Sequence, residues 1–195
     1  MGNVCKCLFV LVALFMLVSC ATVEKDKINL AGEWFFKIDP DDKGTAERWY
    51  SSAYNDTVLL PGSMAENNKG YLVDLNTKWT GSILDSSWYS LDKYKKYREP
   101  GNMKIPFWLQ PTIHYVGAAW YQRQIEIPEN WDGKRIELFL ERCHWETKVW
   151  VDSTYVGMKN SLGTANVFDL SAYLKPGRHT INIRIDNRIK DVDVG

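Results

Sequence analysis

Apolar and polar residues alternate with a period of two along much of this chain of 195 residues. The alternation is clearest in RIELFLE (135–141), ETKVWVD (146–152) and HTINIRIDN (179–187), and it recurs in GEWFFKID (32–39) and AWYQRQIEIP (119–128). Successive side chains of a strand point to opposite faces, so each stretch predicts a half-buried β-strand. The body of the chain is therefore predicted to be all-β.

Turn-forming pairs separate these stretches, at Asp132-Gly133, Asp152-Ser153 and Pro176-Gly177. Only TAERWYSS (45–52) suggests a helical turn, and no long stretch has the helical period. Several short strands at this spacing are typical of two packed antiparallel sheets. The predicted fold class is a jelly-roll antiparallel β-sandwich.

A long stretch at about 66–112 departs from the alternating pattern. It is rich in Gly, Asn, Ser and Lys, and it carries Trp79, Trp88 and Trp108. A loop of this length inside a compact domain is usually functional. We expect an aromatic-rich insertion that packs on the sandwich as a lid, lines a binding surface, or does both.

The first twenty residues have the character of an export signal. Lys6 is the only charged residue before an apolar run from Leu8 to Val18, which is too short to span a bilayer as a helix. LVSC (17–20) resembles the lipobox of bacterial lipoproteins, which implies cleavage before Cys20 and lipidation of its thiol. Residues 21–27 are then a polar tether, and lipid holds the protein to a membrane without spanning it.

Removal of this signal determines how many thiols and what net charge the remaining chain has. Cys5 and Cys7 leave with the signal and Cys20 carries lipid, so Cys143 is the one thiol left and no internal disulfide is expected. The chain has 24 basic and 24 acidic residues, and loss of Lys6 leaves 23 against 24, about −1. This near-neutral balance does not favour nucleic-acid binding.

A cluster of reactive residue types lies between Glu141 and Glu146, and it includes Cys143 and His144. The two glutamates are expected to be solvated or strand-end charges rather than a glycosidase pair. Cys143 and His144 are adjacent on an extended chain and point to opposite faces, so they do not form a nucleophile and base. The scattered histidines and single thiol lack metal-ligand spacing, and neither a metal nor another cofactor is predicted.

Five segments together resemble the N-terminal sugar-binding domain of family 2 glycoside hydrolases, the β-galactosidase and β-glucuronidase group. They are, in order, LAGEWFFKIDPDDKG (30–44), LPGSM (60–64), YVGAAWYQRQIEIP (115–128), GKRIELFLERCHWETKVWVDSTYVG (133–157) and FDLSAYLKPGRHTINIRIDNR (168–188). The resemblance implies one jelly-roll domain over 28–195. In that family an immunoglobulin-like domain and a TIM barrel with both catalytic glutamates follow. The resemblance therefore implies that these domains, and any catalytic residue, are absent from this chain.

Two sugar-contact sites are expected, the first from the resemblance and the second from the chemistry of its side chains. In the β-galactosidases, the loop equivalent to 157–170 supplies an Asp that touches the terminal sugar, and Ser161 stands at that position with Asn160 beside it. Ser161 is a departure, because serine is neutral and shorter, and the loop could instead merely connect strands. In the insertion, Trp108 and Gln110 could stack on a sugar ring and bind its hydroxyls, or pack the insertion onto the sandwich.

The resemblance predicts the N-terminal sugar-binding domain of an exo-acting β-glycosidase, with β-linked glycan ends and the enzyme's other domains as partners. A stand-alone, lipid-anchored carbohydrate-binding module is one alternative, and a purely structural β-sandwich is another. The N-terminal signal predicts an exported, lipid-anchored protein, at the outer membrane on its periplasmic or cell-surface side.

Overall fold

The computed structural model describes residues 26–73, 77, 91–102 and 112–188. The chain divides at Leu30 into a short N-terminal unit, whose described residues 26–30 contain no helix or strand, and a second unit from Ala31 onward. Within the described residues, no helix is both long and apolar enough to cross a membrane.

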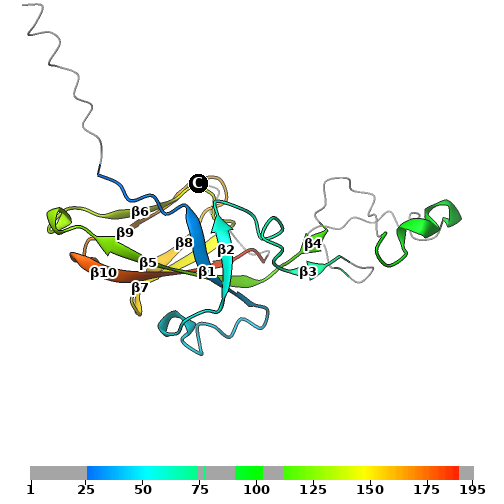
Figure 1. Ribbon diagram of the computed structural model, residues 1–195, viewed down its shortest axis with the longest axis horizontal. Coiled ribbons are helices and arrows are strands. Elements are labelled where there is room, and N and C mark those ends of the chain that lie inside the picture. The colour runs from blue at the N-terminus through cyan, green and yellow to red at the C-terminus, as the bar shows by residue number, and fades with distance from the viewer. Residues whose placement is uncertain (1–25, 74–76, 78–90, 103–111, 189–195) are drawn as a thin grey trace, which may run out of the picture. The chain divides into compact units, whose positions relative to one another are not determined.

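The second unit is built around one six-stranded antiparallel sheet with strand order β2-β1-β5-β10-β7-β8 (Figure 1). Its strands are β1 (Gly32–Asp39), β2 (Asp56–Leu60), β5 (Ala118–Ile127), β7 (Glu146–Val151), β8 (Thr154–Asn160) and β10 (Gly177–Asp186). The strands β5 and β10 are the longest of the six and form the centre of the sheet.

Two smaller antiparallel pairs and three short 3-10 helices complete the described elements. The pairs are β3 (Tyr71–Leu72) with β4 (Ile113–His114), and β6 (Glu137–Leu140) with β9 (Asn166–Asp169). The helices are η1 (Trp49–Ser51), η2 (Asp92–Tyr97) and η3 (Glu129–Trp131). The predicted fold class, an all-β antiparallel sandwich, is confirmed.

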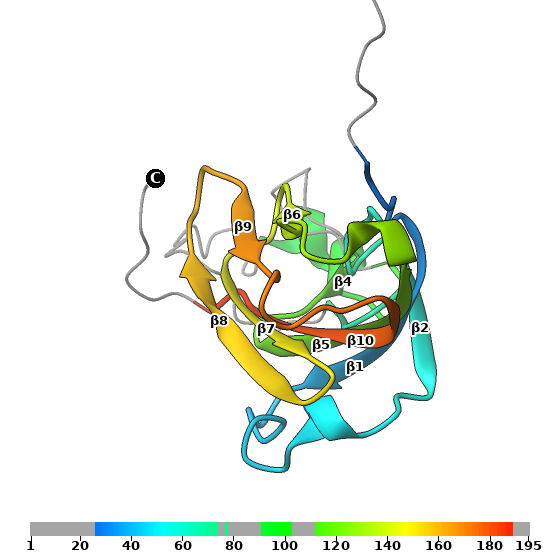
Figure 2. The ribbon, with the colours of Figure 1, turned by 90° about the vertical axis from the view of Figure 1, so that its left-hand side faces the viewer.

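The front core lies between the six-stranded sheet and the β6–β9 pair (Figure 2). Leu138 on β6 is paired with Phe168 on β9, and both side chains are buried. From the sheet, Phe36 and Tyr121 pack edge to face with ring centroids 5.2 Å apart, and Ile183 is also buried. Burial of these large apolar side chains is the main stabilisation available to a domain without a described disulfide.

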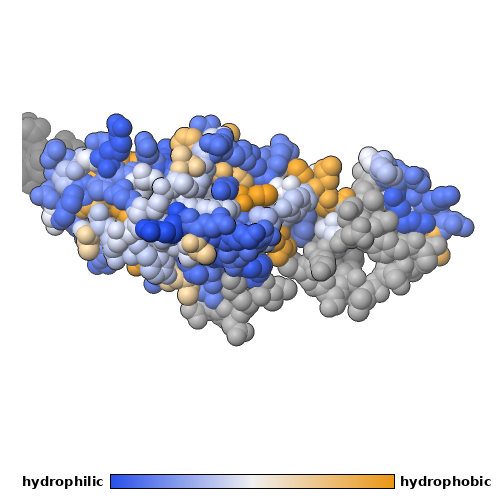
Figure 3. Space-filling view, turned by 90° about the horizontal axis from the view of Figure 1, so that it is seen from below, coloured by the Kyte–Doolittle hydropathy of each residue, from blue (hydrophilic) through white to orange (hydrophobic). Residues whose placement is uncertain are grey.

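The back face of the same sheet carries a second buried cluster. Residues 40–55, the connection between β1 and β2, run across this face, and we call them the covering segment (Figures 1 and 2). Trp120, Trp150 and Tyr54 are buried together there, and Tyr50 stacks on Trp150 at 5.3 Å. The outer surface of this side is mainly hydrophilic (Figure 3), because the covering segment buries the aromatic rings beneath it.

The covering segment is pinned to the sheet by one buried carboxylate. Asp39, at the end of β1, accepts hydrogen bonds of 2.8 Å from the backbone N–H groups of Lys43 and Gly44 and one of 2.9 Å from Trp120 Nε1. A buried carboxylate with three donors is well compensated for its lost hydration. Asp39 thus joins the turn after β1 to Trp120 of the back cluster.

Residues 138–157 are divided between the two sheets of the sandwich. Their first part is in β6, which pairs with β9, and their second part is in β7, which pairs with β10 and β8. Residues 141–145 therefore pass from one sheet of the sandwich to the other, and the cluster of reactive residues lies on this crossing.

Candidate functional site

Five residues form one continuous row across one end of the six-stranded sheet. Asn160 on β8 is opposite Glu146 on β7, which is opposite Asp186 on β10. Asp186 is opposite Ala118 on β5, which is opposite Asp39 on β1. The row lies where β1, β8 and β10 end and where β5 and β7 begin, so loops from all five strands meet at this end.

Asn160 and Ser161, the predicted sugar-contact residues, lie at the β8 corner of this row. Both are half-buried, and Asn160 is the last residue of β8. The Ser161 hydroxyl shares a short hydrogen bond with Thr164 Oγ1 and accepts a 3.3 Å bond from the Thr164 backbone N–H. The side chain of Ser161 thus stabilises its own turn, and this loop offers neutral amide and hydroxyl groups rather than a carboxylate.

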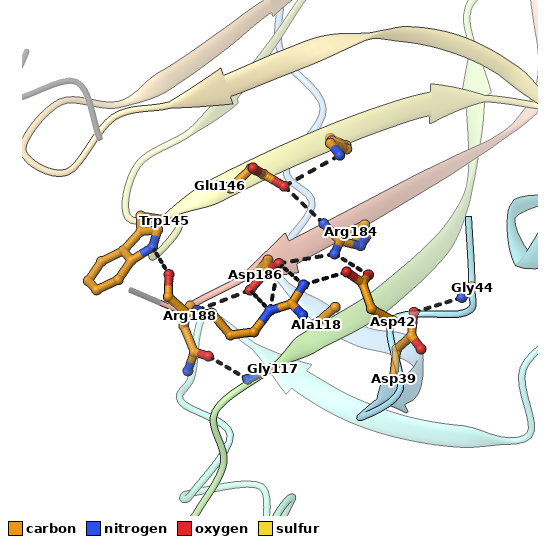
Figure 4. Close-up of polar contacts among 12 residues, drawn as sticks. Asp39, Asp42, Gly44, Gly117, Ala118, Trp145, Glu146, Arg184, Asp186 and Arg188 are labelled. Carbon is orange, nitrogen blue, oxygen red and sulfur yellow. Dashed lines mark hydrogen bonds and ion pairs between the residues drawn. The ribbon is translucent and has the colours of Figure 1, made fainter. Parts of the chain in front are cut away.

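Next to this corner, Arg184 holds three carboxylates on the back face (Figure 4). Its guanidinium donates to Glu146 Oε1 at 3.0 Å, to Asp186 Oδ2 at 3.0 Å and to Asp42 Oδ1. Lys148 Nζ lies 3.5 Å from Glu146 Oε1. Glu146 begins β7 as predicted for a strand-end charge, but its carboxylate is ion-paired and only 14% exposed rather than solvated.

Arg188 continues the network at the point where the chain leaves β10. Its guanidinium donates to both carboxylate oxygens of Asp186 and to Asp42 Oδ2. Its backbone N–H donates to Asp186 Oδ1 at 3.0 Å, and its carbonyl accepts a 2.8 Å bond from Trp145 Nε1. Side chain and main chain of Arg188 are therefore fixed together.

The charges of this network shift the pKa values of its members. Partial burial acts to raise the pKa of Asp42, but hydrogen bonds and charges from Arg188 and Arg184 outweigh burial and hold that pKa below its usual value. Hydrogen bonds to Asp186 and Asp42 raise the pKa of Arg188 further above its ordinary range. Both shifts favour the charged forms of Asp42 and Arg188.

Asn187 lies between Asp186 and Arg188, and its side chain bonds to the residues that precede β5. Its Oδ1 accepts a 2.8 Å bond from the Gly117 backbone N–H, and its Nδ2 donates at 3.0 Å to the Tyr115 carbonyl. The exit is thus bonded to the strand that enters the sheet at the same end.

The reactive residue types of the crossing do not assemble a catalytic site. Glu141 is exposed, and His144 is exposed against the Trp145 ring. Cys143 is half-buried, and burial raises the pKa of its thiol despite side-chain hydrogen bonds with Thr147 and Asn166. Cys143 lies in the crossing rather than on a strand, and its raised pKa disfavours the reactive thiolate.

Other predicted residues are not placed by the structure. Trp108 and Gln110, with Trp79 and Trp88, lie outside the described residues, as does Cys20. Among the residues that the structure describes, no group of His, Cys, Asp and Glu side chains could hold a metal ion.

The Arg184 network could not be found by sequence reasoning, because its partners are far apart in the chain. Asp42 and Arg188 are 146 residues apart, and the charged positions of β10 read as a solvent-facing polar side. The only available signal was the number of acidic and basic residues that flank the turns after β1 and β10.

Comparison with known proteins agrees with this architecture. The family model for glycosyl hydrolases family 2, sugar binding domain, matches residues 28–193. A β-glucuronidase of Paenibacillus borealis is 22% identical over 174 residues, which are 88% of this chain and 23% of that protein. A β-galactosidase of Arthrobacter sp. (strain B7) is 25% identical over 165 residues, 81% of this chain and 15% of that protein.

A solved structure has the same fold. The β-glucuronidase from Ruminococcus gnavus in complex with D-glucaro 1,5-lactone superposes with a TM-score of 0.55 at 19% identity, over 83% of this chain and 22% of that chain. This chain thus spans less than a quarter of the length of these relatives. Because the family model covers nearly all of the sequence, the chain belongs to the glycosyl hydrolases of family 2 and corresponds to their sugar binding domain.

Proposed function

We propose that this domain contacts the terminal sugar of a β-glycoside through Asn160 and Ser161, as the N-terminal domain of an exo-acting β-glycosidase of the β-galactosidase or β-glucuronidase type. One observation carries the proposal. Asn160 is at the same end of the sheet as Asp186, where the chain leaves the sandwich. A polypeptide that continues past Arg188 therefore starts at the same end of the sheet as the Asn160–Ser161 corner, two strands away.

The chemistry of this corner suits sugar binding. An amide both donates and accepts hydrogen bonds, and a hydroxyl does the same, which matches the hydroxyl groups of a sugar. Asn160 and Ser161 are half-buried, so bonds that they make are partly shielded from water.

The same corner does not suit bond cleavage. A retaining glycosidase needs two carboxyl groups about 5–5.5 Å apart, one as acid/base and one as nucleophile. Glu146 is engaged by Arg184 and Lys148, and Glu141 lies exposed on the crossing. We therefore assign binding and orientation to this domain, and hydrolysis to carboxylates outside the described residues.

Kinetics of the enzyme that carries this domain test the assignment. Asn160→Ala should raise KM for aryl β-glycosides about tenfold, since one hydrogen bond to bound sugar is lost, with a smaller change in kcat. Lys159→Ala is the matched control, because Lys159 is the exposed neighbour on β8. Equal KM values for both variants and the parent enzyme would refute a sugar contact at Asn160.

Sugar titration of the chain by itself separates the alternatives. An N-terminal domain that completes a site formed elsewhere should bind monosaccharides no more tightly than the millimolar range. Micromolar binding that Asn160→Ala abolishes would instead favour a stand-alone carbohydrate-binding module. Absence of any effect of Asn160→Ala in either setting would favour a purely structural sandwich.

We also propose that Cys20 carries the lipid that anchors the exported protein. The support is the apolar run 8–18 followed by LVSC. Cells fed radiolabelled palmitate should label the protein, and Cys20→Ser should abolish the label whereas Cys7→Ser should not. A label that survives Cys20→Ser would exclude this anchor.

A further inference from the structure

The point where the chain leaves β10 is held by the end of its own strand and by two segments that are distant in sequence. Asp42 comes from the covering segment, Trp145 from the crossing, and Asp186 from the end of β10; all three bond to Arg188. We call these four residues the exit clamp, and Figure 4 shows them converging.

The exit clamp restrains the orientation of Arg188 more than it adds to the free energy of folding. The side chains of Arg188 and Asp42 are 40% and 37% exposed, and ion pairs with this much solvent contribute little net free energy of folding. However, the backbone N–H and the carbonyl of Arg188 are both bonded within the clamp, at 3.0 and 2.8 Å. A residue restrained at both backbone groups and at its guanidinium has one orientation.

The clamp is also connected to the candidate sugar-contact corner. Asp42 bonds to Arg184 as well as to Arg188, and Arg184 bonds to Glu146, which lies opposite Asn160. The side chain of Arg184 is only 3% exposed, so this bridge is shielded from solvent. The chain exit and the end of β8 are therefore parts of one bonded network.

We propose that Arg188 is a positioning residue, which fixes the direction of the chain that leaves the sandwich relative to the Asn160–Ser161 corner. The bonds that fix this chain direction are made without any bound sugar. Only the purpose of that direction, to align a sugar-contact loop with the rest of a longer enzyme, rests on the proposed function.

Hydrogen exchange of two indole N–H groups in the whole chain tests the clamp. Trp145 Nε1 reports the bond to the Arg188 carbonyl, and Trp120 Nε1, bonded to Asp39, reports the rest of the fold. Asp42→Asn should speed exchange at Trp145 about tenfold, the loss expected for one charge-assisted bond, and leave Trp120 unchanged. Asp41→Asn is the matched control, because Asp41 is the neighbouring carboxylate and bonds to Lys43.

Two outcomes would overturn the proposal. One is unchanged exchange at Trp145 in Asp42→Asn, and the other is an equal increase at Trp145 and Trp120, which marks general destabilisation. If Asp42→Asn does not fold, Arg188→Lys serves in its place. Lysine keeps the charge but loses the planar fork, and an intermediate rise in exchange at Trp145 alone is expected.

Kinetics then separate this proposal from the proposed function. In the longer enzyme, Arg188→Ala should lower kcat/KM for aryl β-glycosides about threefold to tenfold, with partial rescue by Arg188→Lys, whereas Arg178→Ala at the other end of β10 should not. No effect of Asn160→Ala would refute the sugar contact but leave the exchange result intact. Normal kinetics in Arg188→Ala together with fast exchange at Trp145 would refute the positioning role alone.

Discussion

Glu146 and Asn160 lie directly opposite each other in the β7–β8 ladder, and Glu146 also accepts a 3.0 Å bond from Arg184. The predicted sugar-contact residue is therefore one ladder position away from the buried ion network. A change in the network can therefore reach the Asn160–Ser161 corner through the backbone of β7.

Glu146→Gln should destabilise the domain by about 2 kcal/mol, because the buried Arg184 guanidinium loses a charged partner while the shape is kept. Urea unfolding followed by tryptophan fluorescence measures the change. Glu126→Gln is the control, since Glu126 lies 3.8 Å from Arg178 and both side chains are exposed. Equal losses in the two variants would contradict a special role for the Arg184 network.

Gly44→Ala should destabilise the domain by about 3 kcal/mol through overpacking. A Cβ at Gly44 would lie 2.3 Å from Trp120 Nε1 and 2.7 Å from Asp39 Oδ2, so the pin between the covering segment and the sheet would have to open. At Gly157 on β8 a Cβ would meet nothing within 4 Å, so Gly157→Ala is the matched control. Thermal unfolding of the two variants decides, and similar midpoints would contradict the close packing described at Gly44.

The stability of the domain should decrease in acid in part because of Asp42. Its pKa is below the usual value of 3.8 in the folded protein, so the folded state binds fewer protons there than the unfolded state does. The resulting stabilisation is complete above about pH 4 to 5 and is lost as the pH falls through the folded pKa.

Asp42→Asn should therefore flatten the pH dependence of urea unfolding between about pH 5 and pH 2. Asp41→Asn, at the next residue, is the control and should leave more of that slope in place. A slope that is the same in the parent chain and in Asp42→Asn would show that the arginines do not favour the ionised carboxylate.

Cys143 should react slowly with an aromatic disulfide reagent in the folded protein. Burial raises the pKa of its thiol, and only the thiolate is reactive. In a chain that starts at Ala21, Cys143 is the one thiol. The absorbance of the released aromatic thiolate therefore reports the reaction of Cys143 directly. Reaction in the folded state at the rate seen in concentrated urea would contradict the buried environment.

Several strands were predictable in detail, because their pattern is local. GEWFFKID (32–39) coincides with β1, and β5 ends at Ile127, just before Pro128, which has no N–H for the ladder. The turn of TAERWYSS appears as η1. In each case the determining property, alternation or a missing donor, belongs to neighbouring residues.

Burial of the back face does not follow from alternation. Along β10, Asn182, Arg184 and Asp186 alternate with isoleucines, as the polar residues of a solvent-facing side do, but all three are buried. Alternation shows that a strand has two different faces, and it does not show what covers the polar one. Here the covering segment returns over that face.

The candidate site too was predictable from the sequence only in part. Asn160 and Ser161 could be selected from the sequence by their position before FDL, whereas the row that joins Asn160 to Asp39 requires the strand order. Neither the order of strands nor the crossing at 141–145 follows from alternation, because period-two patterns fit many pairings.

The sequence alone determined the all-β class, the approximate bounds of five strands (β1, β5, β6, β7 and β10) and the family, because these depend on local periodicity and on motifs in fixed order. Tertiary structure alone decided that charged residues from both ends of the domain meet at one end of the sheet. Asp42 and Arg188 attract each other only after β1, β5 and β10 have paired and brought together positions 146 residues apart. Long-range pairing of this kind is a property of the folded chain, and no local segment contains it.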